Sequence, residues 1–205
     1  MRKIKICGLT RPEDIAAANQ FQPDYIGFVF AESRRRVDEK TAEELRRLLN
    51  PRIKAVGVFV DEAPDTVVSL LLRNVIDMAQ LHGGEGEDEI SYIRKKTGKL
   101  ILQAVRVRNS GDIRQAEKTI ADGLIFDEGK GSGTVFEWGI LRQYLKENGS
   151  GKLKPYFLAG GICPENIEAA LKIPSYGIDL SGGAESGGQK DPEKMKILIK
   201  TVHTA

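Results

Sequence analysis

The side chains best suited to chemistry in this sequence stand directly after short apolar runs. Cys7 follows the alternating run Lys3–Ile6, and Asp127 follows Gly123–Phe126. A thiol can act as a base or a nucleophile where nearby positive charge favours the thiolate, and a partly desolvated carboxyl group can act as a general acid. Both residues also have a simpler interpretation, because strand-end cysteines often only pack and loop aspartates often only accept backbone N–H groups.

Two small-residue turns indicate a phosphate group in the ligand. Gly160 and Gly161 follow one apolar run, and Ser181, Gly182 and Gly183 follow the next. Glycines let backbone N–H groups approach phosphate oxygens, and the helix that follows adds its positive dipole. The alternative is that these glycines only form tight turns. Two such turns after neighbouring strands favour phosphate binding.

A basic run and a single histidine add further candidates. Arg34, Arg35 and Arg36 follow the second apolar run, and arginine suits a planar carboxylate or phosphate. Most charge runs are solvated, so we expect at most one of the three to point into a site. His82 follows the fourth run, where it either contacts a ligand or caps its loop. A histidine with no cysteine or carboxylate at ligand spacing does not predict a metal site.

Apolar strings alternate with helical patterns along the whole chain. The strings start near residues 3, 25, 54, 78, 100, 123, 156 and 177, and a helical segment follows each one. Continuous apolar strands separated by helices are typical of a parallel sheet covered by helices. Eight such units are the number in a closed (β/α)8 TIM barrel of the α/β class, whose size starts at about 200 residues. We predict a single barrel domain over residues 1–205.

An open doubly wound sheet is the competing fold, but it usually carries a glycine-rich turn after its first strand. Here that turn holds Gly8 as its one glycine. Thr10 and Glu13 match a capping box, which predicts the start of the first helix. In a barrel the active site lies at the carboxyl ends of the strands, which brings the candidates above to one face. The loop Glu128–Thr134 lacks a P-loop ending and is interpreted as a mobile flap.

Composition excludes several classes of protein. Thirty-one basic and 29 acidic residues leave a net charge of +2, too little for binding nucleic acid through bulk charge. No apolar stretch approaches the ~18 residues of a membrane span, and Arg2, Lys3 and Lys5 interrupt any signal-like start. Cys7 and Cys163 are expected to be free thiols in a cytoplasmic protein. Nothing in the pattern decides between a monomer and a homodimer.

Several ordered motifs resemble the phosphoribosylanthranilate isomerase family of tryptophan biosynthesis nearly from end to end. They are Lys5–Thr10, Gly27–Phe30 with Ser33–Arg35, Gly57–Val60, Gln80–Gly83, Gly131–Gly133 with Phe136–Trp138, Ala159–Gly161 with Pro164–Asn166, and Asp179–Ser181. Glu137 stands where an aspartate is common in the family. Gly182 replaces a common second serine, which removes a potential hydroxyl contact to phosphate.

The resemblance implies an Amadori rearrangement of N-(5-phosphoribosyl)anthranilate that needs no cofactor. It implies that Cys7 is the general base, that Asp127 is the general acid and that Arg35 holds the anthranilate carboxylate. It also implies that the phosphate is held by the backbone around Gly160, Gly161, Ser181, Gly182 and Gly183. His82 and Asp179 are further candidates for substrate binding.

Two alternatives stay open at this point. One is a lyase or synthase resembling indole-glycerol-phosphate synthase, which needs a lysine acid at a strand end. The sequence shows none ending an inner strand, but a lysine inside the barrel mouth would favour this alternative. The other is a barrel that binds a phosphorylated ligand without turnover, against which the presence of both Cys7 and Asp127 speaks.

Overall fold

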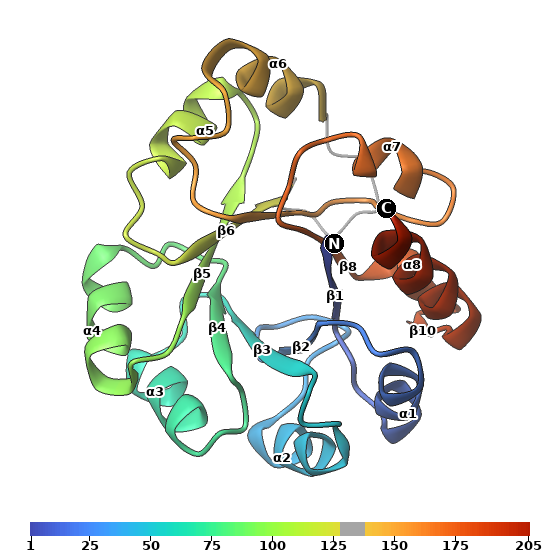
Figure 1. Cartoon of the computed structure of the whole chain (residues 1–205). Helices are drawn as coiled ribbons and strands as arrows, with labels where there is room; N and C mark the ends of the chain where they lie inside the picture. Colours follow the sequence, from blue (N-terminus) through green and yellow to red (C-terminus); the bar gives the residue numbers. More distant parts are fainter. Residues whose placement is uncertain (128–137) are drawn as a thin grey trace.

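Eight parallel strands close into a barrel in the computed structural model, which describes residues 1–127 and 138–205 (Figure 1). Each strand pairs with its neighbour in sequence, and β1 pairs with β8 to complete the ring. The predicted fold class is therefore confirmed. The strands are β1 (Lys3–Cys7), β2 (Tyr25–Val29), β3 (Lys54–Phe59), β4 (Met78–Leu81), β5 (Ile101–Arg106), β6 (Gly123–Asp127), β7 (Tyr156–Leu158) and β8 (Gly177–Leu180).

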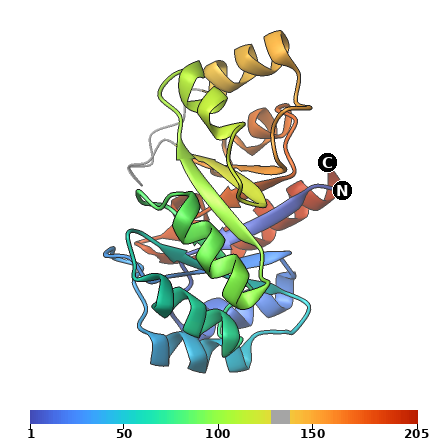
Figure 2. The ribbon, with the colours of Figure 1, turned by 90° about the vertical axis from the view of Figure 1, so that its left-hand side faces the viewer.

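The helices form an outer ring around the strands, as both views show (Figures 1 and 2). Apolar side chains fill the layer between the strands and the helices, including Ile4, Ile6 and Leu198, none of which is exposed. The helices are α1 (Pro12–Phe21), α2 (Glu39–Leu48), α3 (Pro64–Leu72), α4 (Glu87–Thr97), α5 (Ser110–Ala116), α6 (Trp138–Asn148), α7 (Ile167–Leu171) and α8 (Pro192–Thr204).

The start of α1 differs from the predicted capping box. Glu13 is exposed, and the buried carboxylate of Asp14 accepts the backbone N–H groups of Thr10 and Arg11, at 2.9 and 3.1 Å. Asp14 also pairs with the Arg11 guanidinium, at 2.6 Å. Asp14 takes the capping role because an acid one residue further along reaches both free backbone donors while its charge is neutralised.

Two further helices start later than their patterns predict. The sequence pattern after the third strand predicts a helix from Asp61, but α3 begins at Pro64, because Asp61 has a φ of 50° and cannot continue into a right-handed helix. The pattern after the seventh strand predicts a helix from Pro164, but α7 begins at Ile167 after a turn in which the Cys163 N–H donates to the Asn166 side chain.

The barrel interior has an apolar layer below a polar one. Val56, Leu102, Ile125 and Phe157 belong to the apolar cluster inside the ring. Polar and charged side chains are also buried, and three of them stand on inner strands: Lys5, Gln80 and Asp179. Buried charges are retained in proteins when they are paired, so this layer requires the specific contacts described below.

A small hairpin that the sequence patterns did not predict follows β8. A short 3-10 turn, η1 (Gly182–Ala184), leads into β9 (Glu185–Ser186), which pairs antiparallel with β10 (Gln189–Lys190). Its turn consists of two glycines with φ of 58° and 81°, the backbone geometry that favours glycine in tight hairpins. The hairpin lies at the carboxyl end of β8 and brings two buried charged residues to the mouth of the barrel.

Candidate active site

The carboxyl edge of the barrel collects most of the predicted site residues. Cys7 ends β1, Asp127 ends β6, and His82 and Ser181 directly follow β4 and β8. The His82 Nε2 atom lies 4.0 Å from a carboxylate oxygen of Asp127. The Ser181 hydroxyl donates to the Cys7 carbonyl oxygen over 3.2 Å, which ties the ends of β1 and β8 together.

Cys7 is a buried thiol with 8% of its surface exposed. Its side chain leans over Gly27 of β2, where a methyl group would lie only 2.6 Å from the Cys7 sulfur. Burial raises the pKa of the Cys7 thiol above its usual range, while Lys5 and Lys190 act in the opposite direction. The site therefore holds a desolvated thiol with two cations near enough to stabilise its thiolate.

Lys5 and Asp179 form an ion pair inside the ring. Lys5 has no exposed surface, and its Nζ atom lies 3.0 Å from both carboxylate oxygens of Asp179 on β8. Burial disfavours the Lys5 cation, but Asp179 and Cys7 outweigh it and raise the pKa of Lys5. Lys5 shares its face of β1 with Cys7 because strand side chains alternate. That period of two in the sequence was the signal that could have placed a cation beside Cys7.

Arg35 is the most buried member of the arginine run, as expected for a residue that points into a site. Its side chain is 16% exposed, compared with 60% for Arg34 and 54% for Arg36, which pairs with Glu32 at the surface. The Arg35 guanidinium donates from Nε and Nη2 to the two carboxylate oxygens of Glu185, at 2.6 and 3.0 Å. No sequence pattern indicated Glu185 as the acidic partner of Arg35.

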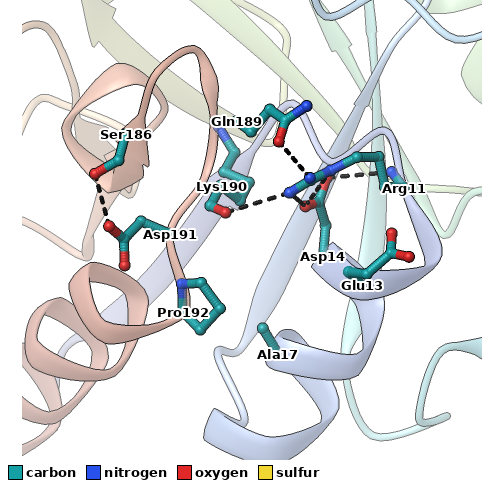
Figure 3. Close-up of a pocket in the computed structure, with 9 residues that line it drawn as sticks. All are labelled: Arg11, Glu13, Asp14, Ala17, Ser186, Gln189, Lys190, Asp191 and Pro192. Atoms are coloured by element: carbon teal, nitrogen blue, oxygen red, sulfur yellow. Dashed lines mark hydrogen bonds and ion pairs between the residues drawn. The ribbon is translucent and has the colours of Figure 1, made fainter.

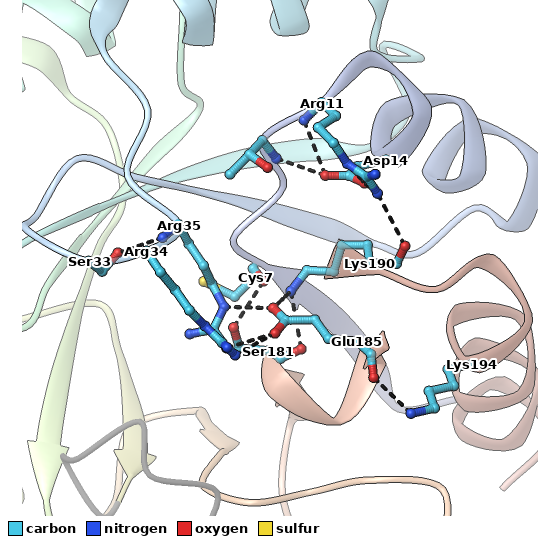
Figure 4. Close-up of polar contacts among 11 residues, drawn as sticks. Cys7, Arg11, Asp14, Ser33, Arg34, Arg35, Ser181, Glu185, Lys190 and Lys194 are labelled. Carbon is cyan, nitrogen blue, oxygen red and sulfur yellow. Dashed lines mark hydrogen bonds and ion pairs between the residues drawn. The ribbon is translucent and has the colours of Figure 1, made fainter. Parts of the chain in front are cut away.

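Glu185 and Lys190 are the functional candidates that sequence reasoning missed. Glu185 accepts from Arg34 at 2.7 Å and from Lys190 at 2.6 Å, in addition to Arg35 (Figure 4). Burial raises the pKa of the Glu185 carboxyl, but Arg35 and Lys190 outweigh it and lower the pKa. Burial also lowers the pKa of Lys190 despite the opposing pull of Glu185. One buried carboxylate thus contacts three cations.

The two glycine turns lie against each other. Gly160 and Gly161 have φ of 85° and 63°, conformations that other residues rarely adopt. A methyl group on Gly183 would lie 1.9 Å from the carbonyl oxygen of Ile162, so the turns after β7 and β8 touch through their backbones. A methyl group on Gly182 would lie 3.4 Å from Nη2 of Arg35, which places the guanidinium beside the second turn.

His82 is held at the edge of the site by its backbone and its neighbours. Its N–H donates to the Phe59 carbonyl oxygen at 2.8 Å, and its Nδ1 atom lies 3.5 Å from the side-chain nitrogen of Gln80. With Nδ1 facing Gln80, Nε2 faces Asp127. The glycine-rich loop Glu128–Thr134 and Glu137 lie outside the described residues, so the structure does not test the flap prediction.

Within residues 1–127 and 138–205, no three or more histidine, cysteine or acidic side chains are grouped so that they could hold a metal ion. Both cysteines are free thiols. Among the described helices, none has the length and apolar character needed to cross a membrane.

This arrangement defines a class of protein: a (β/α)8-barrel enzyme whose site, at the carboxyl ends of the strands, combines a thiol, carboxyl groups and cations. The family model for N-(5'-phosphoribosyl)anthranilate isomerase matches residues 4–201. The chain belongs to that family.

Individual relatives agree with the family match. The N-(5'-phosphoribosyl)anthranilate isomerase of Caldanaerobacter subterraneus subsp. tengcongensis is 41% identical over 208 residues, covering 98% of each chain. A crystal structure of a phosphoribosylanthranilate isomerase in complex with reduced 1-(o-carboxyphenylamino)-1-deoxyribulose 5-phosphate is 28% identical, with a TM-score of 0.87 and full coverage of both chains. Monomers generated from the dimeric enzyme of Thermotoga maritima are 29% identical, with a TM-score of 0.87 and the same coverage.

The buried lysines bear on the lyase alternative, because a lysine inside the barrel mouth would favour it. Lys5 and Lys190 are both buried near the mouth, but each ammonium group is already paired with a carboxylate, Asp179 or Glu185. The isomerase family model spans nearly the whole chain. The isomerase interpretation therefore has the stronger support.

Proposed function

We propose that this protein catalyses the Amadori rearrangement of N-(5-phosphoribosyl)anthranilate to 1-(2-carboxyphenylamino)-1-deoxyribulose 5-phosphate in tryptophan biosynthesis, without a cofactor. The observation that carries the proposal is the family match over residues 4–201. Further support comes from the relative of known structure that binds the reduced form of this product. A phosphate, a carboxylate and a sugar in one substrate also suit a site rich in cations and glycine turns.

In the proposed mechanism Asp127 and Cys7 act in sequence. Asp127 gives a proton to the ring oxygen of the sugar. The C1–O bond then breaks while the anthranilate nitrogen lone pair forms a C1=N bond. Cys7 removes the proton from C2, and the electron pair of the C–H bond moves to form an enolamine, which tautomerises to the amino ketone. General acid–base groups of this kind contribute roughly 10²- to 10⁴-fold each.

The other predicted residues bind the substrate in this proposal. Arg35 holds the anthranilate carboxylate through its planar fork, and His82 and Asp179 contact the substrate between its two anionic ends. The backbones of the two glycine turns hold the phosphate. They comprise Gly160, Gly161, Ser181, Gly182 and Gly183. With glycine at 182 the phosphate contact there is made by backbone alone.

The direct test follows the loss of phosphoribosylanthranilate fluorescence in the presence of the purified protein. We expect turnover with the native chain, and Cys7→Ser and Asp127→Asn are each expected to reduce kcat by about 10²- to 10⁴-fold. A near-normal rate in either variant would remove that residue from its proposed role. Tight binding of the reduced product with no turnover of fresh substrate would instead indicate a binding protein.

The proposal also covers the setting in which the enzyme works. We propose that residues 1–205 form one domain that works in the cytoplasm on a small phosphorylated substrate, without nucleic acid, as a monomer or homodimer. Relatives of known structure include both a dimer and monomers generated from it. Light scattering of the purified protein would decide between the two states.

A further inference from the structure

We propose that Glu185 is a positioning residue that orients Arg35 for the carboxylate of the substrate. The inference rests on the proposed function and extends it to a residue of the hairpin after β8. Its basis is the two-point contact from Arg35 Nε and Nη2 to the Glu185 carboxylate, at 2.6 and 3.0 Å. Glu185 is 7% exposed, so water does not compete effectively for this contact.

The contact uses one edge of the guanidinium and leaves another available. Nε and one hydrogen of Nη2 point to Glu185, while among the described residues Nη1 has no hydrogen-bond partner. The edge formed by Nη1 and Nη2 can therefore donate to a second carboxylate in the same plane. Glu185 does not need to leave for the substrate to bind. It fixes the plane and the direction of the donors that the substrate meets.

Glu185 itself is held on a braced hairpin. Lys190 Nζ bridges the Glu185 carboxylate and the Ser181 carbonyl oxygen, at 2.6 and 3.1 Å. Lys194 donates to the Glu185 backbone carbonyl at 2.7 Å. From the other side Arg11 donates to the Gln189 side chain at 2.6 Å, and the two line a groove between α1 and the hairpin (Figure 3). These contacts hold the hairpin that carries Glu185 in place, as a positioning residue requires.

The charge balance explains why the carboxylate is needed in place of a neutral group. Glu185 contacts Arg34, Arg35 and Lys190, so its loss would leave three cations close together with no anion between them. Their repulsion would push the Arg35 guanidinium away from the position that Glu185 now gives it. A displacement of about 1 Å at a binding group can cost up to ~100-fold.

The experiment compares two inhibitors on four proteins. The inhibitors are the reduced product and the same compound without its ring carboxylate. The proteins are the native chain, Glu185→Gln, Arg35→Ala and the double variant. For the carboxylated inhibitor we expect Glu185→Gln to raise the inhibition constant about 10- to 100-fold and the double variant to be no weaker than Arg35→Ala. For the inhibitor without the carboxylate we expect less than about a threefold change in any variant.

The matched control is Glu32→Gln, which removes the carboxylate that pairs with Arg36 at the surface. It should leave both inhibition constants unchanged. Additive losses in the double variant, or an equal loss for both inhibitors, would overturn the positioning role. Where thermal unfolding shows that Glu185→Gln does not fold, Glu185→Asp, which keeps the charge but shortens its reach, takes its place with the same expected pattern. If the native protein neither binds the reduced product nor turns over substrate, the proposed function itself is wrong.

Discussion

Cys7 meets two opposing demands at a single atom. Its sulfur is buried above Gly27, which favours the neutral thiol, yet the proposed base must lose its proton. Lys5 on the same strand and Lys190 in the hairpin both favour the thiolate, but burial is the larger effect and the pKa of Cys7 is raised. The surroundings of Cys7 in the free enzyme therefore favour the neutral thiol over the thiolate.

The raised pKa predicts the pH dependence of the reaction. Because the thiolate is the active form, kcat/KM should rise about tenfold per pH unit from neutral pH and level off only above the ordinary thiol pKa of ~8.5. The check is the pH profile of turnover and of iodoacetamide inactivation in a Cys163→Ser background, which leaves Cys7 as the one thiol. If kcat/KM already levels off below pH 7, burial does not raise the pKa of the Cys7 thiol.

At the scale of elements, residues that end long strands can be placed from the sequence, whereas residues in very short strands cannot. Cys7 and Asp127 could be placed because each ends a strand of five residues, one alternating and one apolar, which is long enough to show a strand pattern. Glu185 and Lys190 could not, because they stand in strands of two residues each, too short for any alternation. The Gly187-Gly188 pair was the available signal for that hairpin.

Lys5 was missed for a different reason. A lysine in an alternating run reads as the solvent face of a strand, whereas inside a closed barrel that face is the interior. Only the register that sets Lys5 opposite Asp179 reveals the pair, and that register depends on closure between β1 and β8. Such long-range pairing is set by the whole ring, which no local pattern encodes.

The Lys5–Asp179 pair should be costly to break from one side. Lys5→Met leaves a buried carboxylate without its partner and is expected to lower the free energy of unfolding by about 3–5 kcal/mol. The Asp179 pKa is already raised by burial, and it should rise further without Lys5. Since the folded state then binds a proton that the unfolded state releases near pH 4, the loss should grow between pH 4 and pH 8.

Urea unfolding at several pH values measures this loss. The control is the double variant Lys5→Met with Asp179→Leu, which removes both charges and should recover most of the stability. If Lys5→Met lowers the free energy of unfolding equally at pH 4.5 and pH 8, Asp179 is not the carboxyl group that loses its partner.

The contact between the two glycine turns makes Gly183 intolerant of any side chain. In Gly183→Ala the new methyl group would meet the Ile162 carbonyl oxygen and the Cys163 Cα, so the turns must separate. We expect a loss of about 1–3 kcal/mol in unfolding free energy and weaker inhibition by inorganic phosphate. Gly139→Ala in α6 is the control, because no described residue has an atom within 4 Å of the added group and alanine favours a helix. Equal phosphate inhibition in both variants would separate the turns from phosphate binding.

On the scale of the whole molecule, one carboxylate joins the two ends of the chain. Asp24, just before β2, accepts from Lys3 of β1 at 2.7 Å, and its other oxygen accepts the Ile4 N–H at 3.0 Å. That second oxygen also lies 3.1 Å from Nε2 of His203 in the last helix. The two termini also lie close together in both views of the chain (Figures 1 and 2). The contacts of Asp24 with Lys3, Ile4 and His203 thus stabilise barrel closure in addition to the β1–β8 hydrogen bonds.

The Asp24 contacts predict how the stability of the whole fold changes at acid pH. Burial alone would raise the pKa of Asp24, but hydrogen bonds from Lys3, His203 and the Ile4 backbone outweigh it and lower the pKa. A lowered folded pKa gives stability that is fully present above the unfolded value of ~3.9 and is lost as the pH falls through the folded value. Asp24→Asn should therefore cost about 1–3 kcal/mol at pH 7 and progressively less below pH 4.

Thermal or urea unfolding across pH 3–8 would measure the difference between the native chain and Asp24→Asn, with exposed Asp88→Asn as the control expected to stay within about 0.5 kcal/mol. Hydrogen exchange should at the same time show faster opening of β1 and α8 in Asp24→Asn than of β4 and β5 on the far side of the ring. Uniform acceleration over all eight strands would mean that Asp24 supports the fold without specifically joining its ends.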